Sequence, residues 1–156
     1  MEPRIRVGVL IFKEEKLLLV KHVNPADGFT WWVPPGGGIE SHETIHEAAR
    51  REVHEETGLD VKPGDPVYMR QFIYEEFGQN NMDIYLTATV LGGSETMEHM
   101  YGKGNDEHFI KELGYFSKED IQGITVFPKA LQSRLWDDRE EGFPKIVFLG
   151  VERDKE

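Results

Sequence analysis

The hydrophobic positions near the start of the chain predict two strands. Residues 4–12 form an apolar stretch rich in Val and Ile, and residues 17–23 form a second one. The four residues between them, 13–16, are all charged and suit a short turn. Two apolar runs joined by a short polar turn are typical of a β-hairpin, so we expect these strands to pair with each other.

A helical pattern follows over residues 41–57. At 100° per residue, Ile45 and Ala48 fall on one face and the opposite face is polar. Ser41 is a suitable N-cap residue, and Gly58 suits the position just after a helix. We therefore predict one amphipathic helix with these limits.

The remaining pattern predicts strands that alternate with turns and a second helix. In order, we expect a turn-rich connection at 61–66, strands at 67–77 and 82–91 joined by a hairpin turn at 78–81, a loop at 92–106, a strand at 107–116, an N-capped turn at 117–120, an amphipathic helix at 127–140 and a strand at 145–149. Strand pairs combined with two helices predict a mixed α/β fold. We expect one domain over residues 1–156.

Three glutamates of the first predicted helix lie on its apolar face. Glu52, Glu55 and Glu56 are spaced i, i+3 and i+4, so they are neighbours that repel one another. They project from the apolar face, where a carboxylate loses hydration, and they lie near the helix end that disfavours anions. A solvated acidic surface is the ordinary explanation for a charge run, but here the polar face lies on the other side. A divalent cation such as Mg²⁺ or Mn²⁺ would offset all three costs.

Residues 37–59 carry a motif of fixed spacing around these glutamates. The motif resembles the signature of the Nudix hydrolases at Gly37, Glu43, Arg51, Glu52, Val53, Glu55, Glu56, Gly58 and Leu59. The resemblance implies an α/β/α sandwich, in which a curved mixed sheet lies between helices. It also implies hydrolysis of a diphosphate linkage with Mg²⁺ or Mn²⁺ as the cofactor.

The resemblance assigns roles to residues of this motif and of the glycines before it. It implies that Glu55 and Glu56 ligate the metal and that Glu52 is either a ligand or the general base. The carbonyl of Gly36 would complete the coordination sphere. Arg51 would orient the glutamates; the alternative is an exposed ion pair with the glutamate four residues earlier.

Candidates outside the motif rest on weaker grounds. Some family members take the general base from a later loop, where Glu112 or Glu107 could serve as base or ligand; each could equally be a surface acid. Asp106 is a lesser candidate in the same region. The possible substrate contacts are Trp32, Arg70, Tyr74, Phe77 and Lys103, although most of the aromatic residues should belong to the core.

Composition narrows the class of partner. The net charge is −11, from 29 acidic and 18 basic residues. This argues against binding to nucleic acid or a membrane surface, which would need a basic face. There are no cysteines, which excludes disulfides, zinc–thiolate sites and thiol catalysis. The longest apolar run, 7–12, is too short for a membrane span or a signal peptide, so we expect a cytoplasmic protein.

The main functional hypothesis is a Mg²⁺-dependent pyrophosphohydrolase acting on a nucleoside diphosphate derivative. One alternative is a nucleoside-triphosphate pyrophosphohydrolase that removes damaged nucleotides. The other is a ligand-sensing Nudix domain without turnover. The sequence leaves open the substrate, the attacked phosphorus, the number of metal ions and the oligomeric state, a homodimer included.

Overall fold

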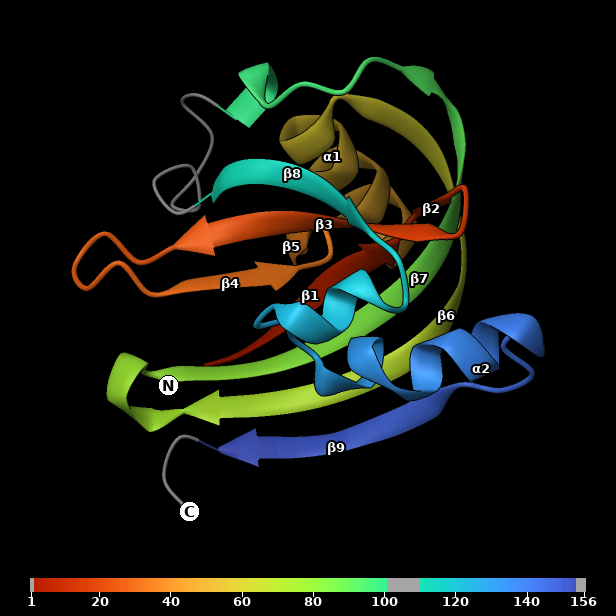
Figure 1. Ribbon diagram of the computed structural model, residues 1–156. Helices are drawn as coiled ribbons and strands as arrows, with labels where there is room; N and C mark the ends of the chain where they lie inside the picture. Colours follow the sequence, from red (N-terminus) through yellow and green to blue (C-terminus); the bar gives the residue numbers. More distant parts are fainter. Residues whose placement is uncertain (1, 101–109, 154–156) are drawn as a thin grey trace.

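The computed structural model describes residues 2–100 and 110–153, which form two β-sheets with helices around them (Figure 1). The strands are β1 (Pro3–Leu10), β2 (Phe12–Lys13), β3 (Lys16–Val23), β4 (Thr30–Val33), β5 (Gly36–Gly38), β6 (Leu59–Tyr74), β7 (Gln79–Gly93), β8 (Ile110–Phe116) and β9 (Val147–Arg153). The α-helices are α1 (Ile45–Thr57) and α2 (Arg134–Glu140), and the 3₁₀ helices include η1 (Glu75–Phe77), η2 (Glu98–Met100), η4 (Asp120–Gly123) and η5 (Lys129–Gln132).

The larger sheet is mixed and has the strand order β5-β1-β7-β6-β9. Strand β1 is parallel to β7 and antiparallel to β5, whereas β6 is antiparallel to β7 and parallel to β9. The smaller sheet runs β2-β3-β4, and β8 pairs with β3. Strand β5 therefore forms one edge of the larger sheet.

The two α-helices cover opposite faces of the larger sheet. Val7 and Val9 of β1 pack in one cluster with Ala48 of α1. The next position, Leu10, points to the other face and packs with Leu135 of α2. Because successive strand residues alternate between faces, we call these the α1 face and the α2 face. The helices on both faces of a mixed sheet confirm the predicted fold class.

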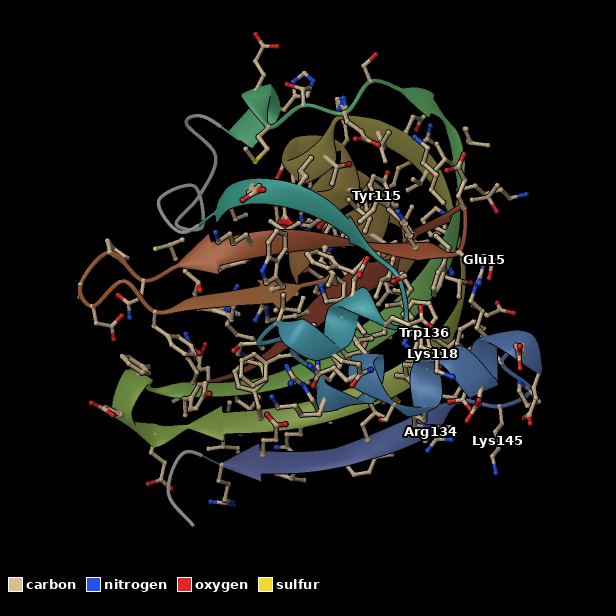
Figure 2. All side chains as sticks on the ribbon, in the orientation of Figure 1. Glu15, Tyr115, Lys118, Arg134, Trp136 and Lys145 are labelled. Atoms are coloured by element: carbon tan, nitrogen blue, oxygen red, sulfur yellow. The ribbon has the colours of Figure 1, made fainter. Side chains whose placement is uncertain are left out.

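Helix α2 itself shows the same division between buried and exposed sides. Trp136 is buried in the core of the α2 face, and its Nε1 donates a hydrogen bond to the carbonyl of Leu131, 3.0 Å away. Arg134 extends from the helix in a different direction and pairs with Asp138 at 2.8 Å (Figure 2). The short helix is therefore anchored by two adjacent buried side chains, Leu135 and Trp136.

The predicted N-terminal hairpin is correct only for the residues next to its turn. Phe12 of β2 pairs with Leu17 of β3, as expected. Strand β1, however, pairs with β7 and β5 in the other sheet. The hydrophobic pattern identified the strands, but a local pattern carries no information about a partner that lies far along the chain.

A hairpin joins β6 to β7 as predicted, but its turn is η1 with Gly78 at φ 63°, not residues 78–81. Residues 79–81 already belong to β7 and pair with residues 72–74 of β6. The turn-rich connection predicted at 61–66 is wrong, because β6 begins at Leu59 and already pairs with β7 there. The register shifts between Pro63 and Pro66. The prolines interrupt the ladder of hydrogen bonds locally without ending the strand.

The first helix begins later than predicted. Thr44, not Ser41, is the N-cap: its side chain accepts a hydrogen bond from the backbone N–H of Glu47, and the Glu47 side chain accepts one from the N–H of Thr44. This reciprocal pair is a capping box. The predicted stop is confirmed, because Gly58 has φ 79° and its N–H donates to the carbonyl of His54.

The predicted helix at 127–140 is interrupted. Residues 129–132 form η5, and Ser133 has the non-helical angles φ −137° and ψ −100° before α2 begins. Leu131 of η5 and Leu135 of α2 are nevertheless both buried, as the amphipathic pattern requires. In the described part of the chain, no helix is long and apolar enough to cross a membrane.

Candidate active site

Strand β5 brings the glycines into direct contact with α1. The N–H of Gly36 donates a hydrogen bond to Oε1 of Glu56 at 3.0 Å. A Cβ atom on Gly37 would lie 2.6 Å from Oε1 of Glu52, so any larger residue at that position would displace this carboxylate. The carboxylates of α1 therefore lie directly on the backbone of the sheet edge.

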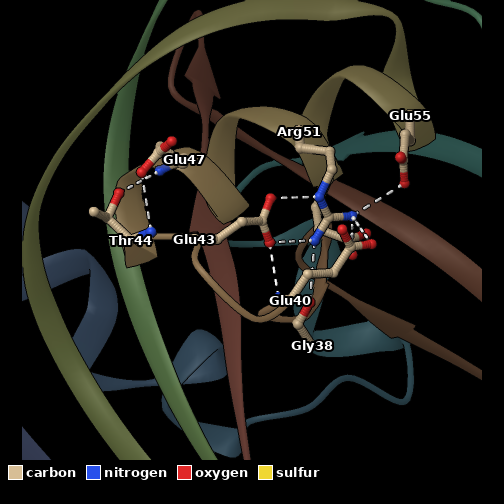
Figure 3. A network of polar contacts seen from close by, with 8 residues as sticks. Gly38, Glu40, Glu43, Thr44, Glu47, Arg51 and Glu55 are labelled. Carbon is tan, nitrogen blue, oxygen red and sulfur yellow. Dashed lines mark hydrogen bonds and ion pairs between the residues drawn. The ribbon is translucent and has the colours of Figure 1, made fainter.

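Arg51 connects this strand to the carboxylates (Figure 3). Its Nη2 donates to the carbonyl of Gly38 at 3.2 Å. Its Nε and Nη2 donate to the two oxygens of Glu43 at 2.7 and 2.9 Å. Its Nη1 lies 3.0 Å from Oε1 of Glu52 and 3.4 Å from Oε2 of Glu55. One guanidinium thus fixes the relative positions of three motif glutamates.

These contacts change the proton affinities of the groups involved. Hydrogen bonding to Glu43 raises the pKa of Arg51 further above its already high value. Hydrogen bonding to Arg51 holds the pKa of Glu43 below its usual value. Both residues stay charged near neutral pH, so the ion pair persists under physiological conditions.

The motif glutamates have the burial that the helix wheel predicts. Glu56 is 3% exposed, and the side chains of Glu52 and Glu55 are 13% and 23% exposed. A carboxylate removed from water is costly unless it is paired or hydrogen-bonded. Here the N–H of Gly36 and the guanidinium of Arg51 supply part of that compensation.

The donor set suits a hard divalent cation by its chemistry. Carboxylate oxygens and a glycine carbonyl are the ligands that Mg²⁺ and Mn²⁺ prefer. Among residues 2–100 and 110–153, no three His, Asp or Glu side chains are already arranged to hold a metal ion. Arg51 contacts one oxygen of each of two motif carboxylates, Oε1 of Glu52 and Oε2 of Glu55.

Glu112 lies on β8 and is paired elsewhere. Its carboxylate lies 3.7 Å from Nζ of Lys21 on β3, and 60% of its side chain is exposed. The other proposed base, Glu107, lies outside the described residues, as do Asp106 and Lys103. The choice between Glu52 and a residue after the motif therefore stays a prediction.

The structure does not gather the predicted substrate contacts in one place. Trp32 packs edge-on against Phe116, with ring centroids 4.7 Å apart. Arg70 is 9% exposed and forms an ion pair with Asp83 at 3.0 Å. The remaining two, Tyr74 and Phe77, are exposed neighbours where β6 meets β7, with centroids 6.2 Å apart.

An open depression borders the site along α1. It is lined by Arg50, Arg51, His54 and Glu55 of α1 and by Glu98 and His99 of η2. The rings of His54 and His99 stack with centroids 4.5 Å apart, which holds η2 against the helix. Glu55 therefore faces a space that is open to solvent.

Two arginines that the sequence analysis does not single out lie next to β5. Arg6 of β1 stands opposite Gly38 in the strand register. A Cβ atom on Gly38 would clash with Nη2 of Arg4, so the guanidinium of Arg4 lies against this glycine. The spacing i, i+2 within a predicted strand was the available signal, since it places both side chains on one face.

Comparisons with known proteins identify the family. Residues 2–138 match the family model of the NUDIX domain, so the chain belongs to this family. Phosphatase NudJ of Escherichia coli K12 is 36% identical over 72 residues, which is 46% of this chain and 46% of that protein. The chain thus spans about half the length of the curated relatives that it matches.

Solved structures share the fold at lower identity. A NUDIX hydrolase from Nitrosomonas europaea is 23% identical over 90% of both chains, with a TM-score of 0.68. A UDP-X diphosphatase is 19% identical over 95% of this chain and 68% of its own, with a TM-score of 0.68. An ADP-ribose pyrophosphatase from Streptococcus suis is 22% identical over 98% of this chain and all of its own, with a TM-score of 0.59.

Proposed function

We propose that this protein is a divalent-metal-dependent pyrophosphohydrolase that cleaves a diphosphate linkage in a nucleoside diphosphate derivative. The observation that carries the proposal is the placement of Glu52 and Glu56 against the backbone of the glycine strand, inside the motif of the family, with Glu55 linked to Glu52 through Arg51. Two proteins of similar fold, the UDP-X diphosphatase and the ADP-ribose pyrophosphatase, are named for diphosphate compounds and support this substrate class.

The cofactor would be Mg²⁺ or Mn²⁺. Glu55, Glu56 and the carbonyl of Gly36 would hold it, because they form an oxygen-only donor set at the edge of the sheet. Glu52 would be a further ligand if it is not the general base. Bound there, the cation would neutralise charge on the phosphate oxygens and make a water molecule easier to deprotonate.

The residues of the chain position this chemistry. Glu52 would accept a proton from the attacking water, unless a residue after the motif such as Glu112 or Glu107 does so. Arg51 would keep Glu52 and Glu55 oriented through its fixed pair with Glu43. Its role is positioning, since ordered outer contacts keep ligand side chains in a productive geometry.

The test is a turnover assay on a panel of phosphoric anhydrides with Mg²⁺, with Mn²⁺ and with EDTA. We expect the fastest hydrolysis for nucleoside diphosphates linked to a second group, and none with EDTA. Undiminished activity in EDTA would contradict the metal mechanism. Preference for nucleoside triphosphates would favour the alternative pyrophosphohydrolase, and tight binding without turnover would favour a sensor.

A further inference from the structure

Two arginines lie on the α2 face of the larger sheet, one strand away from the β5 edge whose backbone contacts the α1 glutamates. In β1, Arg4 and Arg6 point to this face, together with Asn81 and Asp83, their register partners on β7. On the other side of β1, Arg6 stands opposite Gly38 of β5. Neighbouring strands lie about 4.8 Å apart, so both arginines are one strand away from the edge that carries the motif.

Gly38 is contacted by arginines from two directions. Arg51 donates to its carbonyl, and the guanidinium of Arg4 lies where a side chain at this position would be. Arg51 is surrounded by carboxylates, with Glu43 and Glu52 within 3.0 Å. Arg4 and Arg6, by contrast, have no such carboxylate contacts within the described residues.

Among the residues that the structure describes, Arg4 and Arg6 lack carboxylate partners. Within residues 2–100 and 110–153, neither side chain forms a salt bridge or a hydrogen bond, although the chain holds 29 acidic residues. Asp83, the cross-strand neighbour of Arg6, is already paired with Arg70 at 3.0 Å. Arg4 is exposed and Arg6 is half-buried, so both remain available to a ligand.

We infer that Arg4 and Arg6, on the α2 face next to β5, bind one phosphate group of the substrate. This is the phosphate group that the water molecule does not attack. This inference rests on the proposed function and names the part of the substrate held there. A chain with a net charge of −11 repels a polyanion overall, so local unpaired cations are needed to hold it. Arginine suits this role because its planar guanidinium donates two parallel hydrogen bonds to a phosphate.

The experiment compares the variants Arg4→Gln, Arg6→Gln and their combination with the wild type. For a diphosphate substrate, each single change should raise KM about tenfold and the double change about a hundredfold, with kcat within about twofold, because a lost charged contact weakens ground-state and transition-state binding equally. Titration of the metal-free proteins with inorganic pyrophosphate should show affinity falling from the wild type to the single variants and again to the double variant. Thermal melts check that the variants are folded.

Arg153→Gln is the matched control. Arg153 lies on β9 of the same sheet, pairs with Glu75 at 3.7 Å and is about half exposed, so this change removes an equal charge away from the site. The inference is overturned if the double variant and the control have the same KM and the same pyrophosphate affinity. A raised KM with unchanged pyrophosphate affinity would also overturn it, because the arginines would then contact another part of the substrate.

The two proposals can fail separately. Absence of hydrolysis by the wild type on every diphosphate would reject the proposed function. The pyrophosphate titration would still decide the role of the arginines, since it needs neither metal nor turnover.

Discussion

Glu43 and Arg51 form a two-pronged ion pair, in which Nε and Nη2 of the arginine donate to separate oxygens of the glutamate at 2.7 and 2.9 Å. Two parallel bonds fix the plane of the guanidinium as well as its position. The third nitrogen, Nη1, is thereby directed at Glu52 and Glu55. A residue just before the helix thus sets the geometry of carboxylates two and three turns later.

Replacing Arg51 by Lys should separate charge from geometry. Lysine keeps the positive charge but cannot make the paired contact with Glu43. We expect kcat to fall about 10- to 100-fold, as is typical when a residue that orients metal ligands is lost. The free energy of unfolding should fall by about 1–2 kcal/mol. Steady-state kinetics and urea unfolding measure the two effects.

The control for this change is Arg50→Lys. Arg50 forms an exposed ion pair with Asp60 at 2.8 Å, and exposed pairs contribute little. Wild-type kcat in the Arg51 variant would mean that a positive charge alone is sufficient there.

The ion pair should also appear in the pH dependence of stability. The pKa of Glu43 lies below its ordinary value of 4.5 because of Arg51. Its stabilisation is therefore fully present above pH 4.5 and is lost as the pH falls through the lowered folded-state pKa. The unfolding free energy of wild type should exceed that of Glu43→Gln at pH 7, and the difference should shrink towards pH 3. Urea unfolding across this range measures it, and a constant difference would contradict the ion pair.

The contact between Gly37 and Glu52 predicts an effect of one methyl group. In Gly37→Ala, the new Cβ would lie 2.6 Å from the Glu52 carboxylate and displace it. We expect kcat to fall at least about tenfold, because a misplaced reacting group is costly to catalysis. Gly123→Ala is the control, since nothing lies within 4 Å of a Cβ at that position. Equal kcat values in the two variants would reject the assigned role of Glu52.

Glu56→Gln should abolish activity while preserving the fold. We expect at least about a hundredfold loss of kcat, which corresponds to roughly 2.7 kcal/mol. The amide oxygen of Gln can still accept the hydrogen bond from Gly36, so the metal-free melting temperature should stay near that of wild type or rise. Mg²⁺ should stabilise wild type more than the variant, by binding linkage. Thermal melts with and without Mg²⁺, beside the turnover assay, measure both. A melting temperature several degrees below wild type would assign Glu56 a structural role.

The sequence predicted the helix face that carries the glutamates because periodicity is a local property. The buried position of Glu56 follows from its spacing to Ala48 and Ala49, which are fully buried. The start of the helix was predicted three residues early, at Ser41. The pattern Thr-x-x-Glu at Thr44 contained the correct N-cap, since a capping box needs an acidic or amide side chain three residues on.

Long-range contacts could not be predicted from one sequence. Nothing local to Arg6 indicates that it stands between Gly38 and Asp83, because that arrangement depends on pairing with two distant strands. In the same way, the pair between Glu112 and Lys21 requires β8 to lie beside β3. The charge and burial of a residue indicate its contacts only after the strand register is known.

The position of β1 also bears on how the chain folds. This strand is synthesised well before its parallel partner β7, which begins only at Gln79. Contacts of high sequence separation slow folding, because a long loop must close before they form. The glycine strand β5 pairs with β1, so we expect it to reach its final position only after β7 has been synthesised and has docked. The edge of the sheet that carries the candidate active site should therefore be among the last parts of the domain to mature.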